Sequence, residues 1–276
     1  MHEHLNKPVA FVMTHESDAS RTNSRGAMSI IALTLTRSLG RAGIDVVRIH
    51  PNRFDPSLDS KYCRAVEVCP NLYSSESALT DYLAGLKTKY PGQHLLIPAS
   101  DDCCLYMARN EEALREHFLL LNPNAKTLQK LKTKRLQYEL AEAAGVPIPE
   151  TYFPEDEAQV LTLAEGLRNY PYVIKPTEAH KWRLAENRTI ANGKKAVTVH
   201  SEDELLAEYR RISVHDSDLM IQEIIEGDDT QLYTFISYRS EETLTLAFCI
   251  RSKLRQKPAN FGYCTASVTC HNDIVE

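Results

Sequence analysis

Residues 220–229 read Met-Ile-Gln-Glu-Ile-Ile-Glu-Gly-Asp-Asp, a β-prone run that enters a glycine turn with two acids beyond it. Residues 172–176 read Tyr-Val-Ile-Lys-Pro, an apolar strand whose terminal lysine is followed by proline. A lysine in that place has a constrained backbone and a long stem, which suits it to bring a point charge to a phosphate. Taken alone, Lys175 is more typical of a solvated strand end, and residues 220–229 of a strand followed by an acidic turn.

The first half of the chain alternates strands and helices. The expected strands are residues 9–13, 45–49, 65–68 and 94–97, and the expected helices are residues 27–39 and 77–90. This rhythm predicts a parallel sheet with helices on its faces. Ligands of such sheets bind beyond the carboxyl ends of the strands, where Asp101 and Asp102 lie. These two acids would hold a substrate amine or, as the favoured alternative, cap the N-terminus of a helix.

The second half of the chain has a different pattern of predicted helices and strands. Residues 126–144 have near-helical leucine spacing and end at Gly145, so we expect a helix there and a domain boundary near residue 125. Asn192-Gly193 stands between two β-prone runs, 188–191 and 195–199, which predicts a hairpin. Ser201-Glu-Asp-Glu204 matches a capping box and opens a helix to about Ile212. Residues 219–223, 232–238 and 243–250 are β-rich.

Composition excludes several classes of protein. The 276 residues carry 32 Lys and Arg against 37 Asp and Glu, a formal charge of −5, whereas a nucleic-acid binder normally has a basic excess. No apolar run is long enough for a membrane span, so we expect no membrane partner. None of the seven cysteines lies in a Cys-x-x-Cys pair, which favours reduced thiols in a cytoplasmic protein. The chain has neither a dinucleotide fingerprint nor a P-loop.

Taken in order, four segments resemble the ATP-grasp superfamily, and most of all its carboxylate–amine ligase branch. They are Lys134, Ala-Gly-Val-Pro-Ile-Pro-Glu-Thr at 144–151, the strand 172–176 and the run 220–229. The resemblance implies an α/β protein in which a small parallel-sheet domain, 1–125, precedes an α+β ATP-grasp domain, 126–276. Residues 126–218 would be the linker helix and small lobe with its lid, and 219–276 the start of the large lobe.

The resemblance also implies a nucleotide site. Lys134, otherwise an exposed helix-face lysine, and Lys175 would contact the ATP phosphates. Glu223 and Ile225 would offer backbone groups to the adenine edge, with Gln222 beside them. The ribose hydroxyls would be held by Asp229.

Residues 177–195 would form the phosphate lid, although this segment departs from the family pattern because it has one glycine, Gly193, and many charges.

Three cations on the segment 251–257 are candidates for catalysis. Strand alternation predicts Arg251, Lys253 and Arg255 on one face, where the resemblance implies a contact with the transferring phosphate or the carboxylate. A solvated sheet face is the alternative.

The resemblance implies Mg²⁺ ligands beyond this basic segment, namely an acid and a Glu-x-Asn pair. No Glu-x-Asn follows residue 223, so the metal ligands are not in this chain, and we expect a C-terminally incomplete ATP-grasp domain, either a fragment of a longer enzyme or a shortened relative.

The implied activity is ATP-dependent ligation of a small-molecule carboxylate and an amine through an acylphosphate, with ATP and Mg²⁺ as cofactors. A nucleotide-binding or regulatory protein with an inactive ATP-grasp core is the alternative, and an unrelated α/β protein that binds another anion is a third. The sequence does not decide the oligomeric state, and a homo-oligomer stays open.

Overall fold

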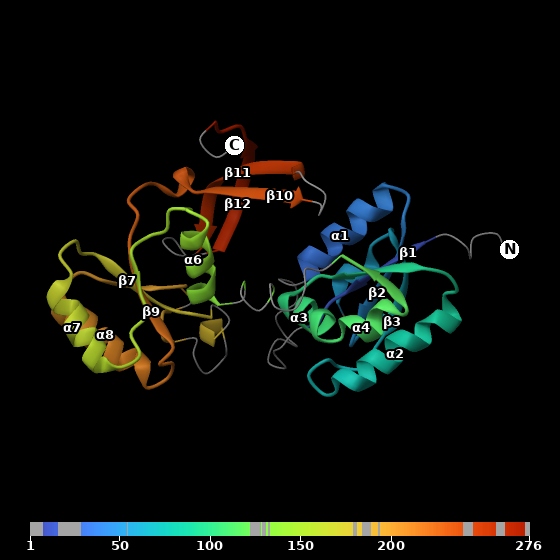
Figure 1. Cartoon of the computed structure of the whole chain (residues 1–276). Helices are drawn as coiled ribbons and strands as arrows, with labels where there is room; N and C mark the ends of the chain where they lie inside the picture. The colour runs from blue at the N-terminus through green and yellow to red at the C-terminus, as the bar shows by residue number, and fades with distance from the viewer. Residues whose placement is uncertain are drawn as a thin grey trace. The chain divides into compact units, whose positions relative to one another are not determined.

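The computed structural model describes residues 8–15, 29–53, 55–121, 128, 131, 133–178, 181–183, 189–192, 194–239, 245–257 and 263–273. The chain divides into two compact units, Met1–Lys132 and Thr133–Glu276 (Figure 1). The predicted boundary near residue 125 lies outside the described residues and stays a prediction.

The first unit is built on a parallel sheet of five strands in the order β3-β2-β1-β4-β5. The strands are β1 (Val9–Met13), β2 (Asp45–His50), β3 (Cys63–Val68), β4 (His94–Pro98) and β5 (Phe118–Leu120). All five residues of β1 are buried, as expected for a central parallel strand that is covered on both faces. The predicted parallel sheet is therefore confirmed, with the added strand β5.

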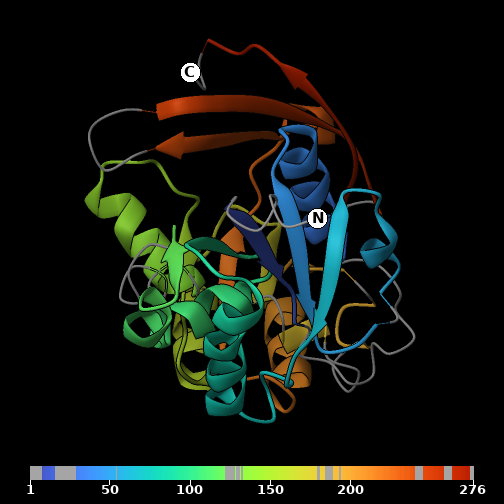
Figure 2. The ribbon, with the colours of Figure 1, turned by 90° about the vertical axis from the view of Figure 1, so that its right-hand side faces the viewer.

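Helices cover both faces of this sheet. Helix α1 (Ser29–Arg41) packs against the face that carries Val12 and Val46 (Figure 2). The opposite face, with Phe11 and Met13, packs against the other helices. These are α2 (Glu76–Lys89), α3 (Asp101–Arg109) and α4 (Glu111–Arg115). Since α2 and α3 both begin beyond carboxyl strand ends and pack on one face, their N-termini meet at the same edge of the sheet.

The second unit begins with α6 (Lys134–Ala143) and a four-stranded antiparallel sheet in the order β6-β9-β7-β8. Its strands are β6 (Thr151–Tyr152), β7 (Tyr172–Pro176), β8 (Val197–Val199) and β9 (Leu219–Glu223). Helices α7 (Glu157–Gly166) and α8 (Glu202–Ser213) share one core with β7 and β9. Helix α8 begins as predicted, because Ser201 Oγ accepts a hydrogen bond of 3.2 Å from Glu204 N–H.

One predicted hairpin is wrong, and one predicted helix is confirmed only over its later part. Residues Thr189–Asn192 form turns, and Val197–Val199 pairs with β7, so the predicted hairpin at Asn192 does not form. Tertiary pairing with β7 prevails over the local turn preference. The predicted helix 126–144 starts at Lys134, because Thr133 is extended, with ψ 139°. Leu128 and Leu131 are helical, but the chain does not continue from them as one helix.

A second antiparallel sheet follows the short helical turn Asp229–Gln231, with long strands drawn in orange and red in Figure 2. It consists of β10 (Tyr233–Arg239), β11 (Thr245–Lys257) and β12 (Tyr263–Cys270). The pairing of β11 with β12 shifts register between Lys253 and Arg255. Among the described helices of the chain, none has the length and apolar character needed to cross a membrane.

Candidate nucleotide-binding site

The pairing of β7 with β9 brings Lys175 to Gln222. Gln222 lies opposite Val173, two residues before Lys175 on β7, so the lysine and the glutamine share a face of the sheet. The Lys175 ammonium donates a hydrogen bond to Gln222 Oε1. This contact turns the lysine side chain back along the sheet and holds its charge beside Gln222.

The Gln222 amide links β7 to two further elements. Its Nε2 donates to Tyr138 Oη of α6 at 2.9 Å and to Thr151 Oγ1 of β6 at 2.7 Å. Because an ammonium can only donate, Lys175 fixes which end of the amide faces it. Gln222 is 5% exposed, and both the oxygen and the nitrogen of its side-chain amide have hydrogen-bond partners. The Gln222 side chain therefore links β9 to β7, α6 and β6 through its hydrogen bonds.

Lys134 lies close to this network. It is the first residue of α6, and its N–H donates to Thr177 O, just beyond the end of β7, at 3.2 Å. Burial and then the positive charge of Lys134 lower the pKa of Lys175 from 10.5 to about 8. The two lysines that the resemblance assigned to the ATP phosphates thus lie within electrostatic range of each other.

The predicted adenine hinge follows β9. Glu223 N–H donates to Glu150 O at 3.0 Å, so this backbone donor is used within the sheet. The Glu223 carboxylate accepts from Glu150 N–H at 2.7 Å. Ile225 is 66% exposed, and its backbone N–H has no hydrogen bond within the described part of the chain. The hinge thus presents the backbone of Ile225 to an incoming group.

The turn beyond the hinge is held by its own hydrogen bonds. Gly227 has φ +142°, and a Cβ there would come within 2.7 Å of Gln231 Oε1. That oxygen accepts from Asp228 N–H at 2.9 Å. Asp229, the predicted ribose ligand, opens the short helix Asp229–Gln231, and its side chain lies outside the described residues.

The beginning of the predicted lid is anchored to the segment before β9. Lys181 Nζ lies 2.7 Å from Asp218 Oδ2, and Trp182 Nε1 donates to Asp216 Oδ2 at 3.0 Å. Burial would lower the pKa of Lys181, but the hydrogen bond and charge of Asp218 outweigh it and raise the pKa. Lys181 is thus an anchor of the loop. Residues 179–180, 184–188 and Gly193 of the predicted lid lie outside the described residues.

The predicted basic face on β11 is interrupted. Lys253 pairs with Ser267 and Arg255 with Ala266, so the β-bulge between them breaks the alternation that predicted one shared face. Lys253 Nζ donates to Gln256 Oε1 at 3.0 Å, and Arg255 Nε donates to Thr265 Oγ1 at 3.2 Å. Arg251 is half-buried. The three cations do not form the continuous row that the sequence predicted.

The two acids of the first unit do not cap α3. Ser100 is the N-cap, and its Oγ accepts from Cys103 N–H at 3.3 Å, because a serine hydroxyl at this position reaches the first turn. Asp101 and Asp102 are the first two residues of the helix. Asp102 Oδ2 accepts from Tyr73 Oη at 2.6 Å.

Sequence reasoning missed Tyr138 and Thr151. Tyr138 follows Lys134 by four residues, a spacing that places both on one helix face and could have revealed the tyrosine. Thr151 contacts Gln222 only because β6 pairs with β9, and no local pattern predicts that. Within the described residues, no three His, Cys, Asp or Glu side chains gather in a group that could hold a metal ion.

Comparisons with known proteins agree with this architecture. No family model matches the chain. A D-aspartate ligase from Enterococcus faecium (strain Aus0004) is 23% identical over 200 residues, which cover 70% of this chain and 47% of the relative. An L-amino acid ligase structure from Bacillus licheniformis has a TM-score of 0.56 and 14% identity. The match covers 93% of this chain and 54% of the ligase chain.

An ADP complex of N5-carboxyaminoimidazole synthetase from Staphylococcus aureus has a TM-score of 0.58 and 12% identity. The match covers 91% of this chain and 56% of the synthetase chain. The chain has the fold of the ATP-grasp carboxylate–amine ligases, so the predicted resemblance and the mixed α/β fold class are confirmed. It spans about half the length of the relatives that it matches.

Proposed function

We propose that the chain is the nucleotide-binding part of an ATP-dependent carboxylate–amine ligase. The observation that carries the proposal is the pair of lysines at the end of β7. Lys175 is mostly buried, contacts the neutral amide of Gln222 and is repelled by Lys134. Among the described residues no carboxylate pairs with it. Such a pair of ammonium groups is stabilised by an anion, and a triphosphate supplies several negative charges.

The roles of the remaining residues follow from their places. The exposed Ile225 N–H and the Glu223 carbonyl would bind the edge of adenine, and Asp229 would bind the ribose. ADP in the Staphylococcus aureus relative supports this choice of nucleotide. Lys134 and Lys175 would neutralise phosphate charge, which grows on the leaving ADP as the γ-phosphate is transferred. Bound Mg²⁺ would neutralise further phosphate charge.

The ligation itself is proposed for the whole protein. A substrate carboxylate oxygen would attack the γ-phosphorus and release ADP, giving an acylphosphate. An amine would then attack the acyl carbon, inorganic phosphate would leave, and the amine would lose a proton to give an amide. Arg251, Lys253 and Arg255 are proposed to assist phosphate transfer, and the bulged strand favours one or two of them over the full set.

Thermal unfolding with and without ATP tests the nucleotide site. ATP should raise the melting temperature of this chain, and Lys175→Ala should abolish the rise. Arg168→Ala is a matched control, because Arg168 is a cation of the same unit that hydrogen-bonds only backbone oxygens within the described residues. No rise at millimolar ATP would overturn the proposal. If ATP protects the full-length protein but no carboxylate-dependent ADP release follows, the protein is a nucleotide binder and the ligase assignment is wrong.

A further inference from the structure

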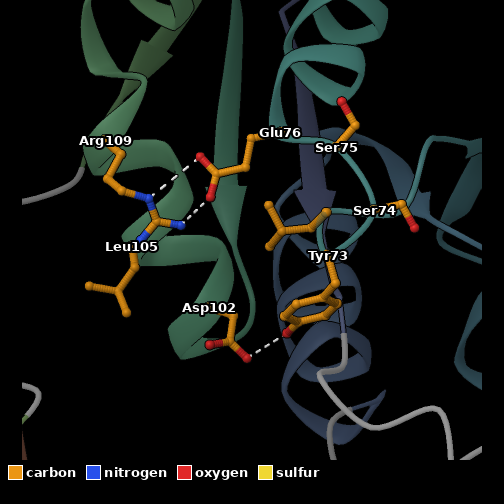
Figure 3. A pocket seen from close by; sticks show the side chains of 8 residues that line it. Tyr73, Ser74, Ser75, Glu76, Asp102, Leu105 and Arg109 are labelled. Atoms are coloured by element: carbon orange, nitrogen blue, oxygen red, sulfur yellow. Dashed lines mark hydrogen bonds and ion pairs between the residues drawn. The ribbon is translucent and has the colours of Figure 1, made fainter.

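The first unit contains a hollow whose lining includes none of the residues discussed for ATP. Its volume is about 350 Å³, within the range of small-molecule pockets. It opens between the start of α2 and one side of α3, beyond the carboxyl ends of β3 and β4 (Figure 3). Its lining residues are Leu72, Tyr73, Ser74, Ser75, Glu76, Asp102, Leu105 and Arg109.

The charges in this hollow are unevenly paired. Arg109 Nη2 lies 2.5 Å from Glu76 Oε1, and Asn110 Nδ2 donates to Glu76 Oε2 at 3.1 Å, so this acid is neutralised. Among the described residues, the one hydrogen-bond donor to the Asp102 carboxylate is the neutral hydroxyl of Tyr73 (Figure 3). No cation within the described residues pairs with Asp102. An ionised carboxylate has about four acceptor positions, so most of its capacity remains open.

The shape and charge of the hollow select the ligand. A primary ammonium has three donors and a positive charge, which complements a carboxylate that has one neutral donor. Leu72 and Leu105 give apolar wall for a short alkyl chain. We propose that this hollow binds a small primary amine, with Asp102 accepting from its ammonium group and Leu105 contacting its carbon chain.

The assignment of this amine as a substrate of ligation rests on the proposed function, but the binding of an amine does not. ATP protection depends on Lys175 in the second unit, and amine binding depends on Asp102 in the first. The two proposals therefore fail separately: a protein that binds ATP and no amine refutes the hollow alone, and the reverse result refutes the nucleotide site alone.

Isothermal titration of the full chain without nucleotide tests the hollow. The probes are n-butylamine, 4-aminobutyrate and butyrate, which share a four-carbon chain. Both amines should bind and butyrate should not, and the ratio of the two amine affinities shows whether the natural ligand carries a carboxylate. Asp102→Asn should weaken amine binding by about tenfold or more, because it removes a charge-assisted hydrogen bond.

Asp101→Asn is the matched control. It removes the same charge from the same helical turn but does not line the hollow, so it should leave amine affinity unchanged. Leu105→Trp should block binding by filling the hollow while it keeps Asp102. A cooperative thermal unfolding transition without any ligand reports that each variant is folded. Equal losses in Asp101→Asn and Asp102→Asn, binding of butyrate as tight as that of butylamine, or no amine binding at millimolar concentration would each overturn the proposal.

Discussion

Replacing Lys175 by methionine should stabilise the protein without nucleotide. Burial and the charge of Lys134 lower the pKa of Lys175 from 10.5 to about 8. This shift corresponds to about 3 kcal/mol of unfavourable free energy for keeping the ammonium charged in the folded state. Methionine has a similar stem and no charge, so it relieves this cost. It also leaves Gln222 Oε1 without its donor, which costs about 1 kcal/mol. The net expectation is a gain of about 2 kcal/mol near pH 7.

The stability difference between Lys175→Met and the wild type should depend on pH in a definite direction. Because the folded-state pKa lies below the unfolded value, the unfolded chain binds more protons between pH 8 and 10.5. The cost of the buried charge is fully present below pH 8 and disappears as the pH rises towards 10.5. The advantage of Lys175→Met should therefore be large near pH 7 and shrink near pH 10.

Urea unfolding followed by the fluorescence of Trp182 measures the effect. Trp182 is the single tryptophan of the sequence, is 6% exposed and lies in the same unit as Lys175. Lys181→Met is the matched control, because the pKa of Lys181 is raised by Asp218 and its loss should destabilise the protein. If Lys175→Met is less stable than the wild type near pH 7, or its advantage is the same at both pH values, the reasoning is refuted.

Further predictions concern the same unit. ATP binding near pH 8 should be accompanied by proton uptake, because nearby phosphate raises the pKa of Lys175. Titration calorimetry in buffers of different ionisation enthalpy measures this uptake. Zero uptake would contradict a contact between Lys175 and the phosphates. Tyr138→Phe removes one partner of Gln222 and should weaken ATP binding several-fold, at a stability cost of about 1 kcal/mol, by calorimetry and urea unfolding. Burial raises the pKa of Asp218, but its hydrogen bonds to Lys181 and Thr177 lower it overall. Asp218→Asn should therefore destabilise the protein at pH 7 more than at pH 3, and equal losses at both would refute the ion pair's role.

Local patterns predicted the elements that local physics determines. The capping serine of α8 and the proline after Lys175 act on their own turn or strand, and both predictions match the structure. The hairpin at Asn192 was wrong because turn preference is only a local term, and β7 supplies a stronger partner for Val197–Val199. The bulge beyond Lys253 depends on how β12 pairs with β11, so strand alternation alone could not predict it.

The candidate site shows the same division. Lys175 could be selected from its own strand, and the spacing of Tyr138 from Lys134 was available on one helix. The contact between Gln222 and Lys175 needs the antiparallel register of β7 with β9, which joins residues 47 positions apart. The assignment of Lys134 and Lys175 to phosphate therefore stays a prediction from the sequence, and the pairing of strands determines how Lys175 is held.

Two lysines show how a structural role differs from a binding role. They are Lys175 of β7 and Lys181 of the loop that follows this strand. Lys181 pairs with Asp218, its pKa is raised, and its charge is satisfied within the fold. Lys175 is more deeply buried, has a neutral acceptor in Gln222, is repelled by Lys134, and has a lowered pKa. If Lys175 served only to stabilise the unit, an acidic residue at position 222 would stabilise its charge better than Gln222 does, as Asp218 stabilises the charge of Lys181. Gln222→Glu should therefore stabilise the free protein and weaken ATP binding, because a carboxylate would neutralise Lys175 and repel the phosphates. Urea unfolding and calorimetry measure the two effects, and a variant that binds ATP as tightly as the wild type would assign Lys175 to the structural role.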